Sequence, residues 1–373
     1  MSTWGVPGLA IGIVKDGEVI YEKAFGVKNL ESHEKIDIHT VFQIASLSKT
    51  FTATLAGLYE EQNKISFSAP VTKYIPGLLL GSEDQTQKIT LKSILSHTTG
   101  FPSHAGDPMI EGGQSFDDIL KNFASLKILY EPGNVYDYQN VIYSIAGKSI
   151  ENKIKQPFAT LIKDKIFIPL DMQDASVGKD NFLNTTNKAS PYVYNIYKRE
   201  HLPVPYSTKY YVVSPAAGVN ASIADMTKWL IFQMGQSEPI MKPETLKMLQ
   251  SPIVKSPEET QRMKLFPGRV PTTYYGLGWR IYDYAGTKMI NHSGMLNGFK
   301  SLLAFLPDQN IGMVILGNTT SKALGILRSA FFDEYLNLPK VDWNQYFKVD
   351  EEKAALAQAK RMQYRKKRRY KKR

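Results

Sequence analysis

A serine and a lysine three residues apart are the feature of this sequence most capable of chemistry. Ser46 and Lys49 stand at the start of a segment in which apolar residues recur with helical spacing from Leu47 to Leu58. If a helix begins at or just before Ser46, both side chains share one face of its first turn. A desolvated lysine can take the proton of a serine, and the positive end of a helix favours the developing negative charge. The pair therefore predicts nucleophilic catalysis.

Two other Ser-x-x-Lys patterns occur, and their surroundings distinguish them from the first. Ser32 lies in a polar stretch that has no apolar stripe to hold a helix. Ser176 is followed by Gly178, which weakens any helix there. Only Ser46 opens an amphipathic helix, although a polar helix start would be the simpler explanation of the motif alone.

Two later motifs strengthen the catalytic interpretation. Tyr138 and Asn140 end a turn-rich loop just before an apolar helical segment, and loop residues are well placed to project into a site. His292, Ser293 and Gly294 end a predicted strand. Glycine there permits close approach of a ligand, and N–H groups at a strand end can stabilise an oxyanion.

The rest of the chain indicates which elements would position these residues. Residues 7–27 read as a β-hairpin around Asp16-Gly17, and a helix is predicted from about Ser46 to Glu61. Residues 65–271 show loops and helices, and strand patterns then return. Further helices are predicted at 116–127, 141–152, 222–235 and 321–336, and late strands at 278–282, 288–292, 300–306 and 312–317.

Strands at both chain ends around a helical middle predict an α+β fold. The terminal strands would form one antiparallel sheet flanked by helices, and the middle would be an inserted, mostly helical domain. The glycine-rich segments match no phosphate loop, and no Gly-x-Ser-x-Gly elbow is present.

The net charge of +11 is confined to the C-terminal tail. Residues 353–373 contain eleven Lys or Arg and no acid, which leaves 35 basic and 35 acidic residues elsewhere. A block of like charge is usually disordered and binds anionic surfaces non-specifically. We therefore expect its removal to leave catalysis and thermal stability nearly unchanged.

Several classes of protein are excluded or disfavoured. The absence of cysteine excludes disulfides, thiolate catalysis and zinc–cysteine sites. No apolar run approaches the ~20 residues of a membrane helix, and the first residues lack a signal-peptide pattern. The histidines have no metal-ligand spacing, so neither a metal nor another cofactor is expected. Four of them are most simply interpreted as surface groups, namely His33, His39, His104 and His201.

The three motifs, in this order, resemble those of the serine β-lactamase and penicillin-binding-protein superfamily, specifically its class C β-lactamase, D-alanyl-peptidase and family VIII esterase branch. His-Ser-Gly at 292–294 stands in place of Lys-Thr-Gly. Accessory phrases also agree, namely Val-Pro-Gly-Leu at 6–9, Leu-Ser-His-Thr-Thr-Gly at 95–100 and Ala217-Gly218 before Ser222.

The resemblance covers about residues 6–340 and implies a β-lactamase/transpeptidase-like catalytic domain. Its sheet part would comprise about 6–62 and 272–340, and its helical part about 63–271. Residues 341–373 would be a C-terminal extension that ends in the basic tail. In the family's turn at 95–100, His97 is expected to be a structural hydrogen bonder.

The resemblance also implies roles for the motif residues. Ser46 would be the acylated nucleophile, and Lys49 and Tyr138 would share the proton transfers, with either as the base. Their proximity would depress the pKa of the phenol. Asn140 would hydrogen-bond an amide of the substrate. His292, Ser293 and Gly294 would contact the substrate from their strand, and the N–H groups of Ser46 and Met295 would form the oxyanion hole.

One departure from the family bears on the substrate. His292 replaces a lysine that helps to hold a β-lactam carboxylate, and losing such a charge-assisted bond weakens binding by roughly 1.5–3 kcal/mol, or about 10- to 150-fold. We therefore expect cleavage of an ester or a D-amino-acid peptide to exceed that of a β-lactam. Relatives are usually exported to the bacterial periplasm or cell envelope, but the sequence itself names no compartment.

Two other classes stay open. A non-catalytic relative could keep the fold for binding or scaffolding, although intact Ser46, Lys49 and Tyr138 argue against it. A nucleic-acid or membrane-surface binder could work through the tail, and salt-dependent binding that truncation removes would reveal it. For the hydrolase, the expected partner is a small-molecule or peptide substrate.

Overall fold

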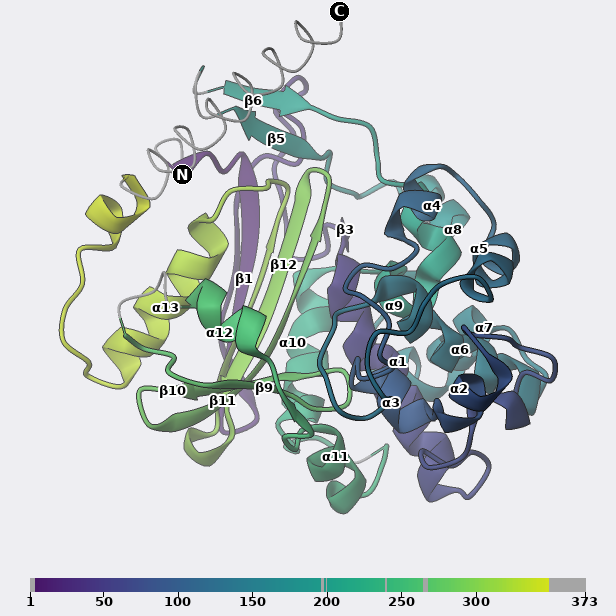
Figure 1. Cartoon of the computed structure of the whole chain (residues 1–373). Helices are drawn as coiled ribbons and strands as arrows, with labels where there is room; N and C mark the ends of the chain where they lie inside the picture. The colour runs from purple at the N-terminus through teal and green to yellow at the C-terminus, as the bar shows by residue number, and fades with distance from the viewer. Residues whose placement is uncertain (1–3, 196–197, 199, 239, 264–267, 349–373) are drawn as a thin grey trace, which may run out of the picture.

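The structure is a computed structural model, and it describes residues 4–195, 198, 200–238, 240–263 and 268–348. The basic tail at 353–373 lies outside the described residues. An eight-stranded antiparallel sheet joins strands from both ends of the chain (Figure 1). In sheet order the strands are β2 (Glu18–Gly26), β1 (Gly8–Lys15), β13 (Ile311–Gly317), β12 (Phe299–Leu306), β11 (Thr287–Leu296), β10 (Arg280–Tyr284), β9 (Thr273–Tyr275) and β8 (Val254–Lys255).

The hairpin predicted over residues 7–27 is confirmed as β1 and β2. Asp16 and Gly17 at its turn have φ values of 49° and 83°. A type I′ turn requires positive φ at both of its central residues, and its twist matches that of the two strands it joins. On its other side β1 pairs with β13, with Leu9 opposite Gly317, so the first strand lies inside the sheet and β2 forms its edge.

Helices cover both faces of the sheet. Along β13, Ile315 points into the apolar cluster under α13 (Ala323–Tyr335), and Leu316 points into the cluster under α10 (Ile223–Gln233). Figure 1 shows these two helices on opposite sides of β1. A Cβ on Gly12 of β1 would lie 2.2 Å from Thr227 Cγ2, so glycine lets α10 pack directly on the strand.

The helical part is centred on two buried helices, α1 (Ser48–Glu61) and α6 (Asn140–Ile154). A helix enclosed by protein is expected to be apolar around most of its surface. Phe51 of α1 stacks on Trp229 of α10 with ring centroids 3.8 Å apart, which joins this part to the sheet. The other helices are α2 (Glu83–Lys88), α3 (Leu91–Leu95), α4 (Asp107–Glu111), α5 (Phe116–Phe123), α7 (Phe158–Ile162), α8 (Lys179–Asn184), α9 (Ser214–Ala217), α11 (Pro243–Leu249) and α12 (Pro257–Met263).

The predicted α+β fold is confirmed, and the middle of the chain adds short strands that were not predicted. Strands of two to four residues are too short to show an alternating pattern. In the described part of the chain, no helix is both long and apolar enough to span a membrane. The small sheets are β3 (Phe42–Gln43), β7 (Val219–Ala221) and β4 (Ser176–Val177), and the hairpin β5 (Tyr192–Asn195) with β6 (Glu200–Pro203).

Candidate active site

Ser46 lies in a single 3-10 turn, η2 (Ala45–Leu47), between β3 and α1. Ala45 has a φ of 51°, a left-handed conformation that is unfavourable for a residue with a Cβ. Its carbonyl accepts a hydrogen bond of 2.6 Å from Ser48 Oγ, which helps to hold it. Such strain is concentrated at functional sites. The turn presents the half-buried Ser46 at the start of α1.

The amine of Lys49 is buried and meets three oxygen atoms. Nζ lies 2.7 Å from Asn140 Oδ1, 3.1 Å from the Ala216 carbonyl oxygen and 3.3 Å from Ser46 Oγ. The first two oxygens can only accept hydrogen bonds. A neutral amine that donates its two N–H groups to them therefore directs its lone pair at Ser46 Oγ.

The surroundings of Lys49 favour this neutral form. Burial lowers the pKa of the amine well below its usual value, and the positive charge of Arg280 acts in the same direction. The negative charge of Asp107 opposes them by raising the pKa. Desolvation has the largest effect, because a charged ammonium is costly where water is excluded.

The phenol of Tyr138 is buried beside this lysine. Lys49 Nζ lies 4.6 Å from the ring centroid, and the Arg280 guanidinium lies 5.3 Å from it. Burial raises the pKa of Tyr138 to about 12, while Arg280 and the nearby Ser46 lower it by less. The predicted depression of this pKa is therefore wrong, because desolvation of the buried phenol outweighs the lowering by its neighbours. Among the described residues, the Tyr138 hydroxyl has no partner in hydrogen-bond geometry.

Asn140 is the first residue of α6, and both ends of its amide are engaged within the protein. Oδ1 accepts from Lys49 Nζ at 2.7 Å, and Nδ2 donates to Asp107 Oδ2 at 2.9 Å. In the observed arrangement Asn140 holds the lysine. Its hydrogen bond to a substrate amide stays a prediction.

Strand β11 passes directly beside the serine turn. A Cβ on Gly294 would lie 2.0 Å from the Ile44 carbonyl oxygen and 2.9 Å from Ser46 N, so only glycine fits. Ser301 Oγ of β12 donates to the same Ile44 oxygen at 2.6 Å and ties the turn to the sheet. The N–H of Ser46 thus lies next to Gly294 and the exposed Met295, where the oxyanion hole is predicted.

His292 of β11 carries no charge into the site. Its Nδ1 lies 3.0 Å from the Ser293 carbonyl oxygen, and its Nε2 lies 3.3 Å from Arg280 Nη1. Because the guanidinium can only donate, Nε2 is the acceptor and Nδ1 carries the proton. Burial, reinforced by the charge of Arg280, holds the pKa of His292 well below its usual range.

A positive charge comes instead from Arg280 on β10, the next strand of the sheet. Its Nε lies 3.7 Å from Glu259 Oε2, on α12, and the same carboxylate pairs with Arg262 at 3.4 Å. Sequence reasoning assigned no role to Arg280. The available signal was the succession of two predicted strands, whose antiparallel pairing places Arg280 opposite Asn291, the neighbour of His292.

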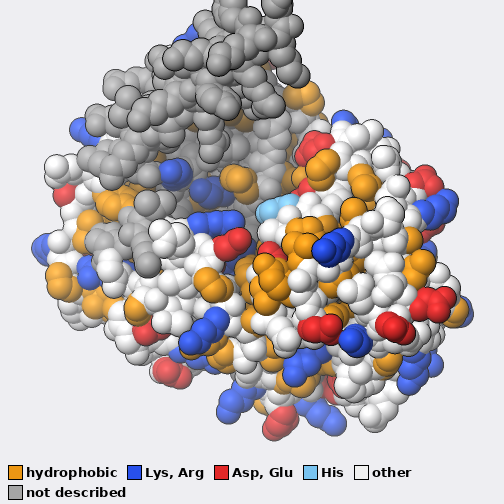
Figure 2. All heavy atoms as spheres, in the orientation of Figure 1, with side chains coloured by type: hydrophobic (Ala, Val, Ile, Leu, Met, Phe, Trp, Pro, Cys, Tyr) orange, Lys and Arg blue, Asp and Glu red, His pale blue; other side chains and the backbone are white. Residues whose placement is uncertain are grey.

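Ser46, Tyr138 and Arg280 face a cavity of about 250 Å³. Its basic side chains outnumber its acidic ones by three to two, so it is suited to an anionic ligand. Figure 2 shows basic, acidic and histidine side chains meeting around a hollow near the middle of this face. The lining residues are Ser46, His104, Tyr136, Tyr138, Glu258, Glu259, Arg262, Arg280, Ser293, Gly294, Met295 and Lys300.

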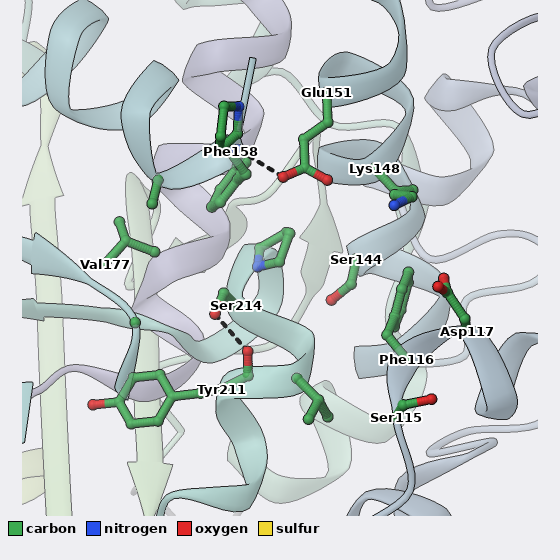
Figure 3. Close-up of a pocket in the computed structure, with 15 residues that line it drawn as sticks. Ser115, Phe116, Asp117, Ser144, Lys148, Glu151, Phe158, Val177, Tyr211 and Ser214 are labelled. Atoms are coloured by element: carbon green, nitrogen blue, oxygen red, sulfur yellow. Dashed lines mark hydrogen bonds between the residues drawn. The ribbon is translucent and has the colours of Figure 1, made fainter. Parts of the chain in front are cut away.

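A second cavity, of about 370 Å³, shares no lining residue with the first. It lies against α6, α9 and the preceding turn, with Lys148 and Glu151 of α6 at its wall (Figure 3). Its Ser144 and Ser214 donate to main-chain carbonyl groups at 3.0 and 2.6 Å. Neither is hydrogen-bonded to a lysine, so the pairing of a serine with a base belongs to the smaller cavity.

The other two Ser-x-x-Lys serines have different surroundings. Ser32 lies on an exposed turn, and Ser176 Oγ accepts from Asn220 Nδ2 at 3.3 Å. Of the three motifs, the described residues show a serine–lysine hydrogen bond only at Ser46. His97 is buried, and its Nδ1 accepts from Gln139 N at 3.2 Å, which is the structural role predicted for it.

Comparison with known sequences gives a family and several relatives. The β-lactamase family model matches residues 1–329. Protein flp of Staphylococcus aureus (strain N315) is 26% identical over 347 residues, which are 92% of this chain and 65% of flp. Unguisins hydrolase ungD' of Aspergillus campestris is 26% identical over 362 residues, 93% of this chain and 66% of that protein. The chain thus spans about two thirds of the length of these relatives.

Comparison with solved structures gives the same fold. The octameric penicillin-binding protein homologue from Pyrococcus abyssi superposes with a TM-score of 0.76 at 25% identity, over 88% of this chain and 75% of that one. EstCE1, a hydrolase with promiscuous acyltransferase activity, superposes with a TM-score of 0.71 at 21% identity, over 86% of this chain and 91% of that one.

Proposed function

The chain belongs to the β-lactamase family, and on that premise we propose that it is a serine hydrolase acting through an acyl-enzyme on Ser46. The observation that carries the proposal is the buried amine of Lys49. Two of its three oxygen neighbours are carbonyl groups, which leaves its lone pair for Ser46 Oγ. Two of the similar proteins, unguisins hydrolase ungD' and EstCE1, are named as hydrolases, which also supports the proposal.

In the acylation step that we propose, neutral Lys49 takes the proton of Ser46 as Oγ bonds to the substrate carbonyl carbon. The oxyanion of the tetrahedral intermediate accepts from the N–H groups of Ser46 and Met295. Tyr138 protonates the leaving group as the bond between it and the carbonyl carbon breaks. A phenol with its pKa raised to about 12 holds its proton until then, and Lys49 returns a proton to it.

Deacylation repeats these roles with water as the nucleophile. Lys49, neutral again, takes a proton as the water oxygen bonds to the acyl carbon, and the bond from that carbon to Ser46 Oγ breaks. Tyr138 protonates Ser46 Oγ as that bond breaks, Lys49 returns its proton to Tyr138, and the acid product leaves. The mechanism assigns the base to Lys49 rather than to Tyr138, because burial favours the neutral form of both groups.

Arg280 bears on the class of substrate. The sequence predicts the loss of a carboxylate-binding cation at His292, and the structure supplies a guanidinium from the adjacent strand. Among the described residues, Arg280 donates a hydrogen bond only to His292, so it has N–H groups to spare. We infer a substrate, an ester or a D-amino-acid peptide, that carries a carboxylate near the scissile bond.

The direct test is covalent labelling. Incubation with a fluorophosphonate should add one phosphonyl group to the intact protein, and peptide mapping should place it on Ser46. An unlabelled protein, or a label on another serine, would contradict the proposed nucleophile.

The proposal predicts how activity depends on pH. The kcat/KM for p-nitrophenyl acetate should rise with pH and level off well below 10.5, the ordinary pKa of a lysine. Below its lowered pKa the amine of Lys49 is protonated and cannot accept the proton of Ser46, so activity falls as the pH falls. A profile between about pH 5 and 10 measures this. A rate that still climbs at the upper end would show that Lys49 keeps its charge.

Arg280→Gln should weaken binding of carboxylate-bearing substrates selectively. The lost charge-assisted bond predicts a rise of about 10- to 150-fold in KM for a depsipeptide with a free carboxylate. The methyl ester of the same depsipeptide should be nearly unaffected, and the ratio of the two is the measurement.

Arg269→Gln is the matched control, because Arg269 also pairs with a carboxylate, that of Asp333 at 3.1 Å, but does not line the cavity. It should leave that ratio close to the wild-type value. Equal losses for both substrates in Arg280→Gln would assign Arg280 a structural role only.

A further inference from the structure

A chain of hydrogen bonds connects the edge of the catalytic cavity to Lys49. Two of its side chains, His104 and Asp107, have no part in the proposed chemistry. His104 Nδ1 lies 2.7 Å from Asp107 Oδ2, which lies 2.9 Å from Asn140 Nδ2. Asn140 Oδ1 in turn lies 2.7 Å from Lys49 Nζ. Hydrogen bonds to an ionised carboxylate are among the strong ones in proteins.

The local backbone brings the Asp107 carboxylate to this place. His104 and Gly106 have φ values of 60° and 85°, which turn the chain tightly before α4. The His104 N–H donates to the Tyr138 carbonyl at 2.7 Å. A Cβ on Gly106 would lie 2.8 Å from Val141 Cγ2, so glycine allows the turn to pack on α6. The turn is thus docked on the segment that carries Tyr138 and Asn140.

The contacts of Asn140 decide which way its amide faces. An asparagine can turn over and present either its oxygen or its NH₂ group to a neighbour. Only the oxygen can accept from Lys49, and only the NH₂ group can donate to Asp107. A flipped amide would set its NH₂ group against the amine, and Lys49 would lose one of the two acceptors that direct its lone pair.

We propose that Asp107 is a positioning residue for the acylation step: it holds the Asn140 amide in the orientation that keeps the Lys49 lone pair on Ser46, and His104 fixes Asp107. This role rests on the proposed function. The other carboxylate oxygen of Asp107 is buried and has no partner among the described residues, so His104 and Asn140 are its observed side-chain contacts.

A double-mutant cycle tests this dependence on Asn140. Asp107→Ala should lower kcat/KM for p-nitrophenyl acetate, and the rate of fluorophosphonate labelling of Ser46, by roughly 10- to 100-fold, because small misplacements of catalytic groups are costly. In an Asn140→Ala background the same substitution should change both rates by less than about twofold, because residues that act through one another are not additive. A loss of folding alone would lower the rates in both backgrounds.

Further variants separate the carboxylate's role as an acceptor from general effects. Asp107→Asn keeps an oxygen that can accept from Asn140 Nδ2 and should retain most of the activity. His104→Ala should give a smaller loss than Asp107→Ala. Asp174→Ala is the matched control, because Asp174 forms a similar pair with His39 at 2.9 Å and is not hydrogen-bonded to the site. It should leave both rates unchanged.

The outcomes distinguish this inference from the function on which it rests. If the wild-type protein is not labelled on Ser46, the proposed function fails. If it is labelled and Asp107→Ala has the same effect in both backgrounds, Asp107 does not act through Asn140 and the positioning role is overturned. Unchanged rates in Asp107→Ala would overturn it as well.

Discussion

Replacement of Ser46 by alanine is expected to abolish both the hydrolysis of p-nitrophenyl acetate and covalent labelling by a fluorophosphonate. Removing the nucleophile of a serine hydrolase lowers kcat by roughly 10⁶-fold, because no other group can form the acyl intermediate. The measurements are kcat/KM and intact mass, made on a variant whose circular dichroism matches that of the wild-type protein.

The chain offers its own controls for this experiment. Ser32→Ala and Ser176→Ala each remove the serine of another Ser-x-x-Lys motif, but neither serine is hydrogen-bonded to its lysine. Both variants should hydrolyse the ester and take the label as the wild-type protein does. Labelling that persists in Ser46→Ala would mean that the nucleophile lies elsewhere.

The second large effect is expected at Lys49. Lys49→Ala should lower kcat/KM by roughly 10²- to 10⁴-fold, the usual contribution of a general base. The substitution also leaves space beside Ser46 Oγ, where a small primary amine can bind and accept the proton of Ser46 in place of Lys49. We expect methylamine to restore part of the activity, with a rate that follows the concentration of its unprotonated form.

Lys153→Ala is the control, because Lys153 is exposed on α6. Its activity should equal that of the wild-type protein and should not respond to methylamine. Activity of Lys49→Ala within about tenfold of wild type would exclude Lys49 as the base.

The elements with clear periodicity were predictable from the sequence. The turn residues Asp16 and Gly17 identified the first hairpin, and the helix predicted over 222–235 is confirmed as α10, which begins with a capping box of Ser222 and Asp225. These signals depend on neighbours in the sequence. The pairing of β1 with β13 depends on which strands meet in space. The sequence predicted only that the strands from the two chain ends would share one sheet.

The candidate site was predictable as far as its motifs extend. Ser46, Lys49 and Tyr138 are brought together, but the pKa of Tyr138 moves in the direction opposite to the prediction. The sign depends on how deeply the phenol is buried, which cannot be read from spacing. Arg280 and Asp107 were missed for a similar reason, because their partners lie on other elements of the chain.

His104 illustrates the same limit. The sequence predicts a surface histidine, and 52% of its side chain is indeed exposed. The structure adds that it lines the cavity beside Ser46 and is hydrogen-bonded to Asp107. A surface position and a place in the site are compatible, and only the arrangement in space reveals the second.

The position of β1 inside the sheet has a consequence for the synthesis of the protein. Leu9 is made about 300 residues before its partner Gly317, which at 5–20 residues per second is roughly 15–60 s. Ser46 and Lys49 are likewise made well before Arg280 and β11. During that interval a nascent chain carries the proposed nucleophile without the strand that completes the site. The proposed active site can therefore form only after β11 has been made.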